Sequence, residues 1–430
     1  MATSGIKVFK FGGASVKSAD GIRNLAKIVQ RYSSARVVVV VSAMGKTTNA
    51  LERILAAYLG SNAETLKSEF DALKSYHFDV AHNLAGDSNS SLMFVELEQL
   101  FGELNTRLTA KPAENYDYNY DQIVSYGELF ATTIVSIYLN QSDVANRWVD
   151  IRTCLKSDTS YREGIIDFIT SESHCQEEFG FAGEQLYVTQ GFIAGTPAGT
   201  TTTLGREGSD YTAAILANLL DAESLTIWKD VDGVRNADPK LFKNTCKLDF
   251  VSYQEAIELA YCGAQIIHPK TIKPVQNKKI PLLVKSFLNP DAEGTQIAHS
   301  DRQMGLPPVF VLKQNQVLIS LTPYDFSFVI EDSLSKIFAI LYKHRVKVNL
   351  VQNSAISFSI CVDGEKYRLP KAIEDLQVDF TVRYNSNLEL LTIRHYTQQA
   401  ITEQVGDRVV YLQQRTRSTA RFVMDARSWA

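Results

Sequence analysis

The sequence has little of what would mark several common classes of protein. Its five cysteines are far apart and form no CxxC pair, so neither a disulfide framework nor a zinc site is indicated. The formal net charge of -4, with lysines and arginines scattered along the chain, offers no basic surface for nucleic acid. No apolar run approaches the roughly 20 residues that a membrane helix needs, and the N-terminus lacks the apolar core of a signal peptide. We therefore expect a cytoplasmic protein with buried, reduced thiols and no nucleic-acid or membrane partner.

Regular alternation of strand-like and helical segments fills the first two thirds of the chain. The run "ARVVVVVSA" is continuously β-branched, as expected for a parallel strand covered on both faces, and the following "TNALERILAAYLG" has helical apolar spacing. Further strand signals, such as "LYVTQGFIA" and "SLTIW", are interleaved with helical ones, such as "DYTAAILANLL". This alternation predicts a three-layer α/β/α sandwich with a mostly parallel sheet.

The amino-acid composition of the chain changes near residue 290. The stretch "NPDAEGTQIAHSDRQMGLPP" is rich in glycine, proline and polar residues, which is typical of a linker or crossing loop. Beyond it, two βαββ-like passes follow, the second shorter than the first, and they predict a duplicated α+β module. We therefore expect one domain over residues 1–297 and a second over residues 298–430.

The first candidate site lies in "IKVFKFGGASVKSADGI". Lys10 ends an otherwise apolar strand, and Gly12-Gly13 let the backbone approach a bound group closely at a strand-to-helix turn, where N–H groups favour an anion. A lysine at this place can stabilise a phosphoryl group in transfer. The alternative is a lysine at the sheet edge whose aliphatic part packs on the sheet while its ammonium stays in water.

Three other stretches carry polar residues in unusual settings. In "TLGREGSDYTAA", Arg206 and Asp210 flank a glycine-containing strand-to-helix turn that suits a substrate with a carboxylate and an amine. Glu128 follows a glycine in an otherwise apolar helix, where a lone acid usually faces solvent. The loop "IWKDVDGVRNADPK" has three aspartates and a glycine after a strand, so it is either an ordinary turn or a loop that binds a nucleotide and Mg²⁺.

Taken in order, these segments resemble the aspartate kinases of the amino acid kinase superfamily. "KFGGASV" is similar to the family's lysine-diglycine signature, "VVVVVSAMGKTTNAL" to its serine-alanine substrate loop, Gly127-Glu128 to its substrate-amine acid, and "TTTLGREGSDYTAA" to its arginine-aspartate turn. The last 120 residues resemble its paired ACT modules. The resemblance implies transfer of the ATP γ-phosphoryl group to the side-chain carboxylate of L-aspartate, giving 4-phospho-L-aspartate, the first step toward lysine, threonine and methionine. It also implies nucleotide-bound Mg²⁺, a homodimer or higher homo-oligomer formed through the ACT modules, and feedback by an amino-acid effector.

The resemblance assigns a role to individual residues. Lys10 would stabilise the transferring phosphoryl group and Asp210 would organise Lys10 and the substrate, with no general base because the attacking carboxylate is already ionised. Glu128 would contact the substrate amine and Arg206 its α-carboxylate. The remaining aspartate pocket would be lined by Ser42, Ala43 and Thr48. The ATP-binding set would be Lys10, Phe11, Gly12, Gly13, Lys229, Asp230, Arg235, Lys240 and Gln265. The effector would meet Asn349, Asn353 and Ser354.

Several positions depart from the family pattern. Ala14 replaces a hydroxyl residue after the diglycine, and Gln265 stands where a lysine is common. Positive charge is gained instead at Lys229 and Arg235, which predicts a rearrangement of charge around the phosphates. Glu207 stands where the family often has glycine and adds a negative charge close to the substrate. Lys240 takes the place of an arginine.

Two other functions stay open at this point: a sister kinase acting on another acidic substrate, and a non-catalytic amino-acid sensor. The ACT pair argues against the first, and intact Lys10 and Asp210 against the second. The resemblance implies that the effector contacts the strand expected at "VKVNLVQNS", where Asn349 replaces an acid that could hold the effector's amine. We therefore expect weak inhibition by lysine or a different effector. The second module is shortened between Thr397 and Arg408, and we expect it to serve dimerisation.

Overall fold

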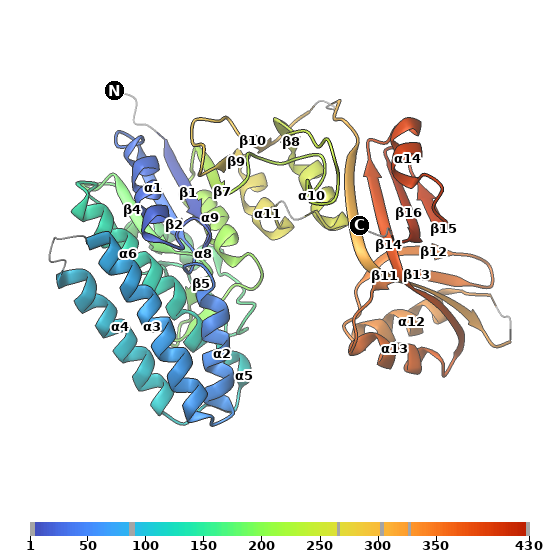
Figure 1. The fold of residues 1–430 in the computed structure, drawn as a ribbon, viewed down its shortest axis with the longest axis horizontal. Coiled ribbons are helices and arrows are strands. Elements are labelled where there is room, and N and C mark those ends of the chain that lie inside the picture. The colour runs from blue at the N-terminus through green and yellow to red at the C-terminus, as the bar shows by residue number, and fades with distance from the viewer. Residues whose placement is uncertain (1–4, 86–90, 265–266, 302–304, 326–327, 427–430) are drawn as a thin grey trace. The chain divides into compact units, whose positions relative to one another are not determined.

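The structure, a computed structural model, describes residues 5–85, 91–264, 267–301, 305–325 and 328–426. It divides into two compact units, which we describe separately (Figure 1). Unit 1 comprises Met1–Val234, Lys247–Ile257 and Ile266–Asp301, and unit 2 comprises Arg235–Cys246, Glu258–Gln265 and Arg302–Ala430. The boundary predicted at residue 297 did not anticipate the two inner segments of unit 2, and the assignment of functions to the two domains stays a prediction.

The core of unit 1 is an eight-stranded sheet with the order β3-β4-β2-β1-β7-β9-β10-β8. Its strands are β1 (Ile6–Phe11), β2 (Arg36–Val41), β3 (Arg147–Val149), β4 (Leu186–Gln190), β7 (Ser224–Lys229), β8 (Phe250–Ser252), β9 (Leu282–Ser286) and β10 (Thr295–Ala298). Neighbouring strands are parallel except for β9 and β10, which are antiparallel. Residues 37–41 of β2 are at most 1% exposed, because helices cover both faces of a central parallel strand. The predicted sandwich with a mostly parallel sheet is confirmed.

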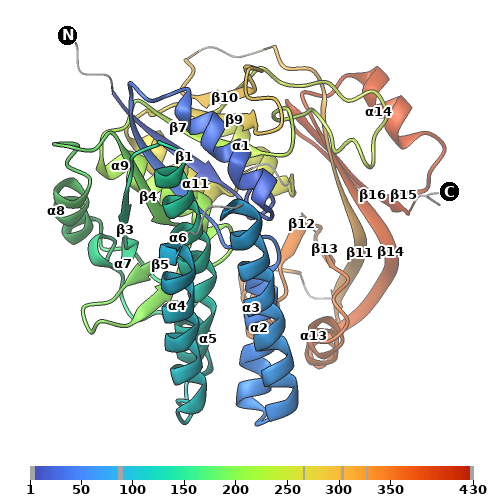
Figure 2. The ribbon, with the colours of Figure 1, turned by 60° about the vertical axis from the view of Figure 1, so that its left-hand side comes forward.

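The helices of unit 1 surround this sheet (Figure 2). They are α1 (Ala19–Gln30), α2 (Thr47–Leu59), α3 (Ala63–Ala85), α4 (Ser91–Thr109), α5 (Tyr116–Val124), α6 (Tyr126–Gln141), α7 (Ile151–Cys154), α8 (Phe168–Glu178), α9 (Gly208–Leu219), α11 (Pro269–Asn277) and the start of α10 (Tyr253–Cys262), which ends in unit 2. A short hairpin, β5 (Ile193–Gly195) with β6 (Thr201–Thr203), lies outside the main sheet. Among the described residues, no helix is long and apolar enough to cross a membrane.

Two predictions for unit 1 were wrong in detail. The stretch "DQIVSYGELFATTIVSIYLN", whose apolar spacing predicts a single helix, forms two helices, α5 and α6, separated at Ser125. The stretch expected as a linker contains β10, because Gly294, with φ +75°, turns the chain back so that it pairs with β9. The ideal Cβ of any larger residue at Gly294 would lie 2.2 Å from the carbonyl oxygen of Val284, so only glycine permits this reversal.

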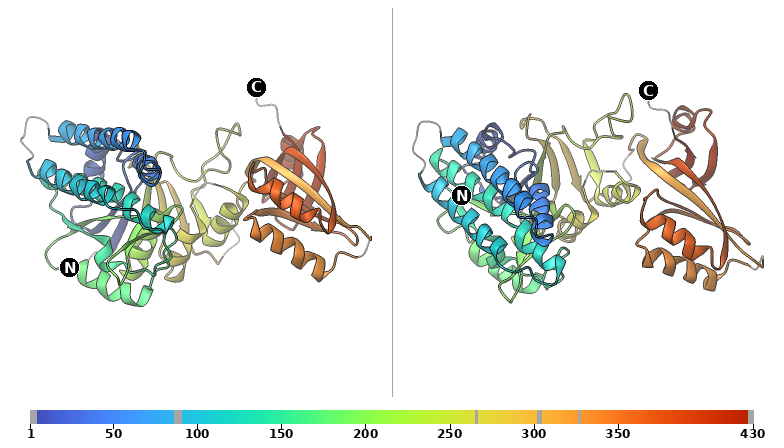
Figure 3. Two further views of the ribbon diagram at one scale, coloured as in Figure 1. Left: turned by 90° about the horizontal axis from the view of Figure 1, so that it is seen from below. Right: turned by 60° about the horizontal axis from the view of Figure 1, so that its bottom comes forward.

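Unit 2 is built on a six-stranded sheet with the order β12-β13-β11-β14-β16-β15. Its elements are β11 (Val309–Pro323), α12 (Glu331–Lys343), β12 (Val348–Asn353), β13 (Phe358–Asp363), α13 (Arg368–Leu376), β14 (Phe380–Arg394), α14 (Gln398–Val405), β15 (Val410–Arg415) and β16 (Thr419–Asp425). Helices α12 and α13 lie against this sheet (Figure 3). Ile337 and Leu341 of α12 and Leu369 of α13 pack on buried residues of β11 and β13. The predicted α+β domain is confirmed, and its division into two related halves stays a prediction.

One long strand, β14, serves both halves of unit 2. The strand signals "DFTVRYN" and "LELLTIRHY" predict two separate strands here, but β14 runs without interruption and pairs with β11 along its length and with β16 along its second half. Asn387, with φ +56°, lies within the strand next to an irregularity in the pairing with β11. The strand continues across this irregularity. The polar residues in its middle had suggested a break.

Two segments from earlier in the chain complete unit 2. Phe242 stacks on Phe310 with ring centroids 5.5 Å apart, and the backbone N–H of Phe310 donates to Asn236 O at 2.7 Å. At the end of α10, Glu258 forms an ion pair with Arg394 at 3.1 Å. These contacts explain why residues 235–246 and 258–264 belong to unit 2.

Candidate active site

Lys10 and Asp210 form a buried ion pair in unit 1. Lys10 lies near the end of β1 and Asp210 in the first turn of α9, and Lys10 Nζ is 2.7 Å from Asp210 Oδ1. Their side chains are 11% and 5% exposed, so Lys10 is not a lysine whose ammonium stays in bulk water. A buried ion pair is retained only when each charge compensates the desolvation of the other. An anion that reached Lys10 would therefore meet a cation already held in place.

The diglycine turn brings the backbone of β1 against the loop that follows β2. The ideal Cβ of a larger residue at Gly13 would lie 2.5 Å from the carbonyl oxygen of Ala43, and Gly45 N donates to Gly13 O at 3.0 Å. The same construction at Gly12 meets only Lys10 Nζ, at 3.3 Å. Gly13 is therefore required for packing, whereas Gly12 leaves the backbone open next to the Lys10 ammonium, as a phosphate cradle requires.

Glu128 is a buried acid with one oxygen left over. Oε1 accepts a hydrogen bond from the backbone N–H of Ala43 at 3.1 Å, while the buried Oε2 has no hydrogen-bond partner among the described residues. Burial raises the pKa of Glu128 to about 8, against the opposing effects of the Ala43 N–H and the charge of Lys10. The expectation that a lone acid in this helix faces solvent does not apply here. Its free oxygen suits an incoming ammonium group.

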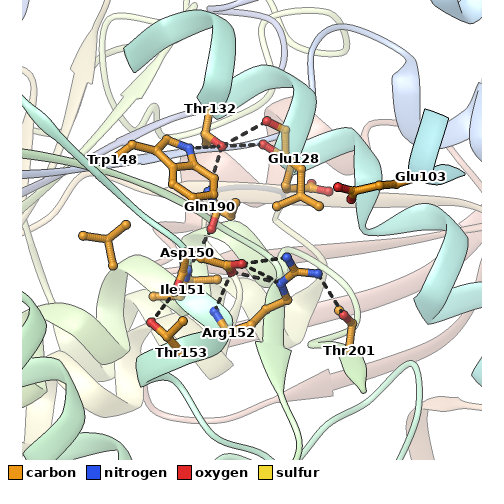
Figure 4. A network of polar contacts seen from close by, with 12 residues as sticks. Glu103, Glu128, Thr132, Trp148, Asp150, Ile151, Arg152, Thr153, Gln190 and Thr201 are labelled. Atoms are coloured by element: carbon orange, nitrogen blue, oxygen red, sulfur yellow. Dashed lines mark hydrogen bonds and ion pairs between the residues drawn. The ribbon is translucent and has the colours of Figure 1, made fainter. Parts of the chain in front are cut away.

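Polar side chains that the sequence did not reveal hold the helix of Glu128 in place (Figure 4). The Thr132 hydroxyl donates to the carbonyl oxygen of Glu128 at 2.8 Å and accepts from Gln190 Nε2 at 2.8 Å. It also accepts from Trp148 Nε1 at 3.0 Å, and Gln190 Oε1 accepts from the backbone N–H of Ile151 at 2.8 Å. Thr132 and Gln190 are fully buried, and their positions as polar residues within largely apolar stretches were the available signal.

A second buried network supports the turn that carries Arg206. Asp121 accepts hydrogen bonds from the backbone N–H of Thr203 at 2.9 Å, from the Thr203 hydroxyl at 2.7 Å and from the backbone N–H of Arg162 at 2.8 Å. Burial raises the pKa of Asp121 to about 6, although these hydrogen bonds oppose the rise. Arg206 itself is exposed and makes no hydrogen bond or ion pair with any residue that the structure describes. Its guanidinium is available to a ligand.

The other predicted aspartate-binding residues lie in the loop after β2, which contacts Glu128 through Ala43, and at the start of α2. Ala43 is buried and Ser42 and Thr48 are half-buried, with Ser42 N donating to Phe11 O at 3.1 Å. Thr48 is the second residue of α2. The structure therefore gathers the diglycine turn, the loop after β2 and the start of α6 in one unit.

The predicted nucleotide residues are divided between the two units. Lys229 ends β7 and Asp230 follows it, exposed, in unit 1. Arg235 and Lys240 belong to unit 2, where the Arg235 guanidinium donates to Thr245 Oγ1 at 2.9 Å and to Thr245 O at 2.8 Å. The Lys240 side chain is exposed.

Two further nucleotide predictions need comment. Phe11 is fully buried and stacks on Trp228 with ring centroids 5.9 Å apart. The ring therefore belongs to the core and the backbone carbonyl is engaged by Ser42 N, so contact of Phe11 with a nucleotide stays a prediction. Gln265 lies outside the described residues.

The predicted effector residues lie on and after β12. Asn349 is buried, and all of its amide is used within unit 2: Oδ1 accepts from Lys313 Nζ, and Nδ2 donates to Gln316 Oε1 and to Asp363 Oδ1, each at 2.8 Å. Asn353 and Ser354 are exposed. Of the three, only these two lie at the surface.

Metal and thiol chemistry receive little support from the described residues. No group of three or more His, Cys, Asp or Glu side chains there could hold a metal ion. The cysteines are free, and four are buried, but Cys246 is exposed. The expectation of buried thiols is therefore wrong for Cys246, which sits in the segment 235–246 that precedes β8.

Comparison with known proteins agrees with this arrangement. Residues 5–286 match the amino acid kinase family, and the chain therefore belongs to that family. It is 31% identical over 361 residues to the lysine-sensitive aspartokinase 3 of Escherichia coli (strain K12), covering 84% of this chain and 79% of that protein. It is also 32% identical over 378 residues to the chloroplastic aspartokinase 1 of Arabidopsis thaliana, of which it spans 63%. Within the family, the chain groups with the aspartokinases.

Solved structures extend the likeness to both units. The crystal structure of E. coli aspartokinase III in complex with lysine and aspartate has a TM-score of 0.81 and 27% identity, with 97% of this chain and 95% of that chain covered. The same enzyme in complex with aspartate and ADP has a TM-score of 0.80 and 27% identity, with 98% and 96% covered. The predicted fold of both domains is thereby confirmed.

Proposed function

We propose that this aspartokinase transfers the γ-phosphoryl group of ATP to the side-chain carboxylate of L-aspartate. The observation that carries the proposal is the set of polar groups already in place in unit 1: the buried Lys10–Asp210 pair at 2.7 Å, the free Oε2 of Glu128 and the exposed guanidinium of Arg206. One cation serves the phosphoryl group, one acid the substrate amine and one cation its α-carboxylate. The E. coli relative has been crystallised with aspartate and ADP.

The reaction balances without a general base. An oxygen of the aspartate side chain forms a bond to the γ-phosphorus, the bond from that phosphorus to the β–γ bridging oxygen breaks, and ADP leaves. The attacking carboxylate is ionised near neutral pH and has no proton to lose. Lys10 would neutralise charge that develops on the transferring group, while Asp210 keeps the Lys10 ammonium in position.

The nucleotide would bring Mg²⁺ with it. Mg²⁺ usually retains waters and binds through one or two carboxylates together with the substrate phosphates, which agrees with the lack of a metal cluster among the described residues. When bound, the ion supplies charge neutralisation for the phosphates. Asp230, exposed at the end of β7, is the carboxylate we assign to it, and Lys229 and the Gly12–Gly13 backbone would contact the phosphates.

For unit 2 we propose amino-acid feedback and self-association through the ACT-like halves. The buried Asn349 amide is engaged by Lys313, Gln316 and Asp363, and as a neutral group it binds an ammonium less strongly than a carboxylate would. This supports weak inhibition by lysine or a different effector, with the exposed Asn353 and Ser354 as contacts. Size measurement in solution tests the proposed homodimer or higher homo-oligomer.

The proposed activity is tested by trapping the acyl phosphate. Protein, ATP and Mg²⁺ are incubated with hydroxylamine and a panel of acidic amino acids, and the hydroxamate is measured. Hydroxamate formed from aspartate supports the proposal. Formation from another acidic substrate instead would favour a sister kinase, and formation from none would favour a non-catalytic sensor.

A further inference from the structure

Glu207 has a backbone conformation that is unusual for its residue type. It lies between Arg206 and α9 with φ 52° and ψ 31°, in the left-handed region. A residue with a Cβ pays a conformational cost there that glycine does not. A glutamate in this place therefore needs a compensating interaction.

The Glu207 carboxylate supplies that interaction. Its Oε2 accepts a hydrogen bond from the backbone N–H of His268 at 3.0 Å. His268 is the N-cap of α11, and a carboxylate is favoured at the positive end of a helix. The negative charge of Glu207 is thus directed at α11 rather than at the ligand side of Arg206.

A second contact ties the same turn to the same helix. Lys270 Nζ donates to the carbonyl oxygen of Leu204 at 3.1 Å and lies 4.7 Å from the ring centroid of Tyr211 in α9. We call the two hydrogen bonds, Glu207–His268 and Lys270–Leu204, the staple. It attaches residues 204–207 to the first turn of α11 on both sides of Arg206.

The staple fixes the Arg206 backbone while leaving its side chain exposed. Arg206 makes no hydrogen bond or ion pair within the described part of the chain, whereas residues 204 and 207 are both held. A binding side chain on a fixed backbone loses less conformational freedom when its ligand arrives. We infer that Glu207 and Lys270 are positioning residues that set the place of Arg206 and thereby tighten binding of the substrate α-carboxylate; this rests on the proposed function.

The staple is tested with two substitutions of Glu207 and one of Glu163, an acid outside this turn. Glu207→Gly removes the hydrogen bond and also relieves the left-handed strain, so it isolates the loss of the carboxylate. Glu207→Gln keeps an acceptor oxygen. Glu163→Gln is the matched control, because Glu163 Cγ is 3.5 Å from an ideal Cβ at Gly205 and its charge influences Lys270, but no hydrogen bond joins it to His268.

The readout is the Michaelis constant for each substrate, together with amide hydrogen exchange at His268. We expect Glu207→Gly to raise KM for aspartate about fivefold or more, with kcat and KM for ATP within about twofold, the pattern for loss of ground-state binding of one substrate. Exchange at His268 should accelerate. Glu207→Gln and Glu163→Gln should resemble the wild type in KM.

The two proposals fail in different ways. Faster exchange at His268 in Glu207→Gly with an unchanged KM for aspartate would overturn the positioning role, as would equal effects on both substrates or a Glu163→Gln variant as impaired as Glu207→Gly. If the wild type phosphorylates a different carboxylate substrate, the proposed function fails, and the same KM comparison made with that substrate still decides the role of the staple. If the wild type phosphorylates nothing, binding of aspartate to wild type and Glu207→Gly is compared by calorimetry, and equal affinities would overturn the role.

Discussion

Aspartate binding should depend steeply on pH because Glu128 must ionise to receive the substrate amine. Burial raises the pKa of Glu128 to about 8, so the group is about nine-tenths protonated at pH 7. Ionising it at that pH costs about 1.4 kcal/mol, or a factor of about ten in affinity. The ionised fraction rises about 25-fold between pH 6.5 and pH 8.5, and kcat/KM for aspartate should rise with it.

The assay is a pH profile of kcat/KM for aspartate, with calorimetry in two buffers of different ionisation enthalpy. Binding at pH 7 should release nearly one proton per site, since the incoming ammonium favours ionised Glu128. Glu128→Gln should raise KM for aspartate far more than KM for ATP and abolish both the profile and the proton release. Asp121, whose pKa is raised to about 6, titrates below this window. A flat profile in the wild type, or an unchanged profile in Glu128→Gln, would refute the reasoning.

The same group makes a prediction about stability. The folded pKa of Glu128 is above its value in the unfolded chain, so the native state binds more protons and its stability falls as pH rises from about 4.5 through about 8. Glu128→Gln removes the buried charge, so the difference in melting temperature between variant and wild type should move in favour of the variant as pH rises from about 4.5 to about 8 and level off above that. A constant difference across that range would show that Glu128 does not titrate as proposed.

Three other outcomes are expected. Lys10→Met should lower kcat at least about 100-fold, and a variant with kcat within a few-fold of the wild type would exclude Lys10 from catalysis. The substitution also leaves Asp210 buried without its partner. The double variant with Asp210→Asn should therefore recover thermal stability but not activity. Gln265→Lys should lower KM for ATP if residue 265 faces the phosphates, and an unchanged KM would place it elsewhere or leave its charge redundant. Lysine, threonine and methionine titrated against aspartate kinetics should reveal weak lysine inhibition or a different effector; strong lysine inhibition of the wild type, unaffected by Asn349→Asp, would contradict our interpretation of the Asn349 network.

Local patterns in the sequence were sufficient for the elements and for several site residues. The β-branched run of β2 and the helical spacing of α2 can both be recognised from neighbouring residues alone. A strand buried on both faces is apolar throughout, and a helix buried on one face has apolar residues at helical intervals. The diglycine turn after Lys10 and the turn at Arg206 were found for a similar reason, since a close backbone approach restricts residue type at the position itself. Resemblance to the aspartate kinases then supplied roles that spacing could not.

Burial and pairing across the chain were decided by the tertiary structure. Whether Glu128 faces solvent depends on the loop after β2, 85 residues away in sequence, and the supports at Thr132 and Gln190 are 58 residues apart. The split of the long helix at Ser125, β10 inside an expected linker and the uninterrupted β14 all depend on strands and helices that no local window contains. Glu207 is the clearest case: its sequence position indicates only an added charge near the substrate, and the partner that directs that charge, the N–H of His268, lies 61 residues further along the chain.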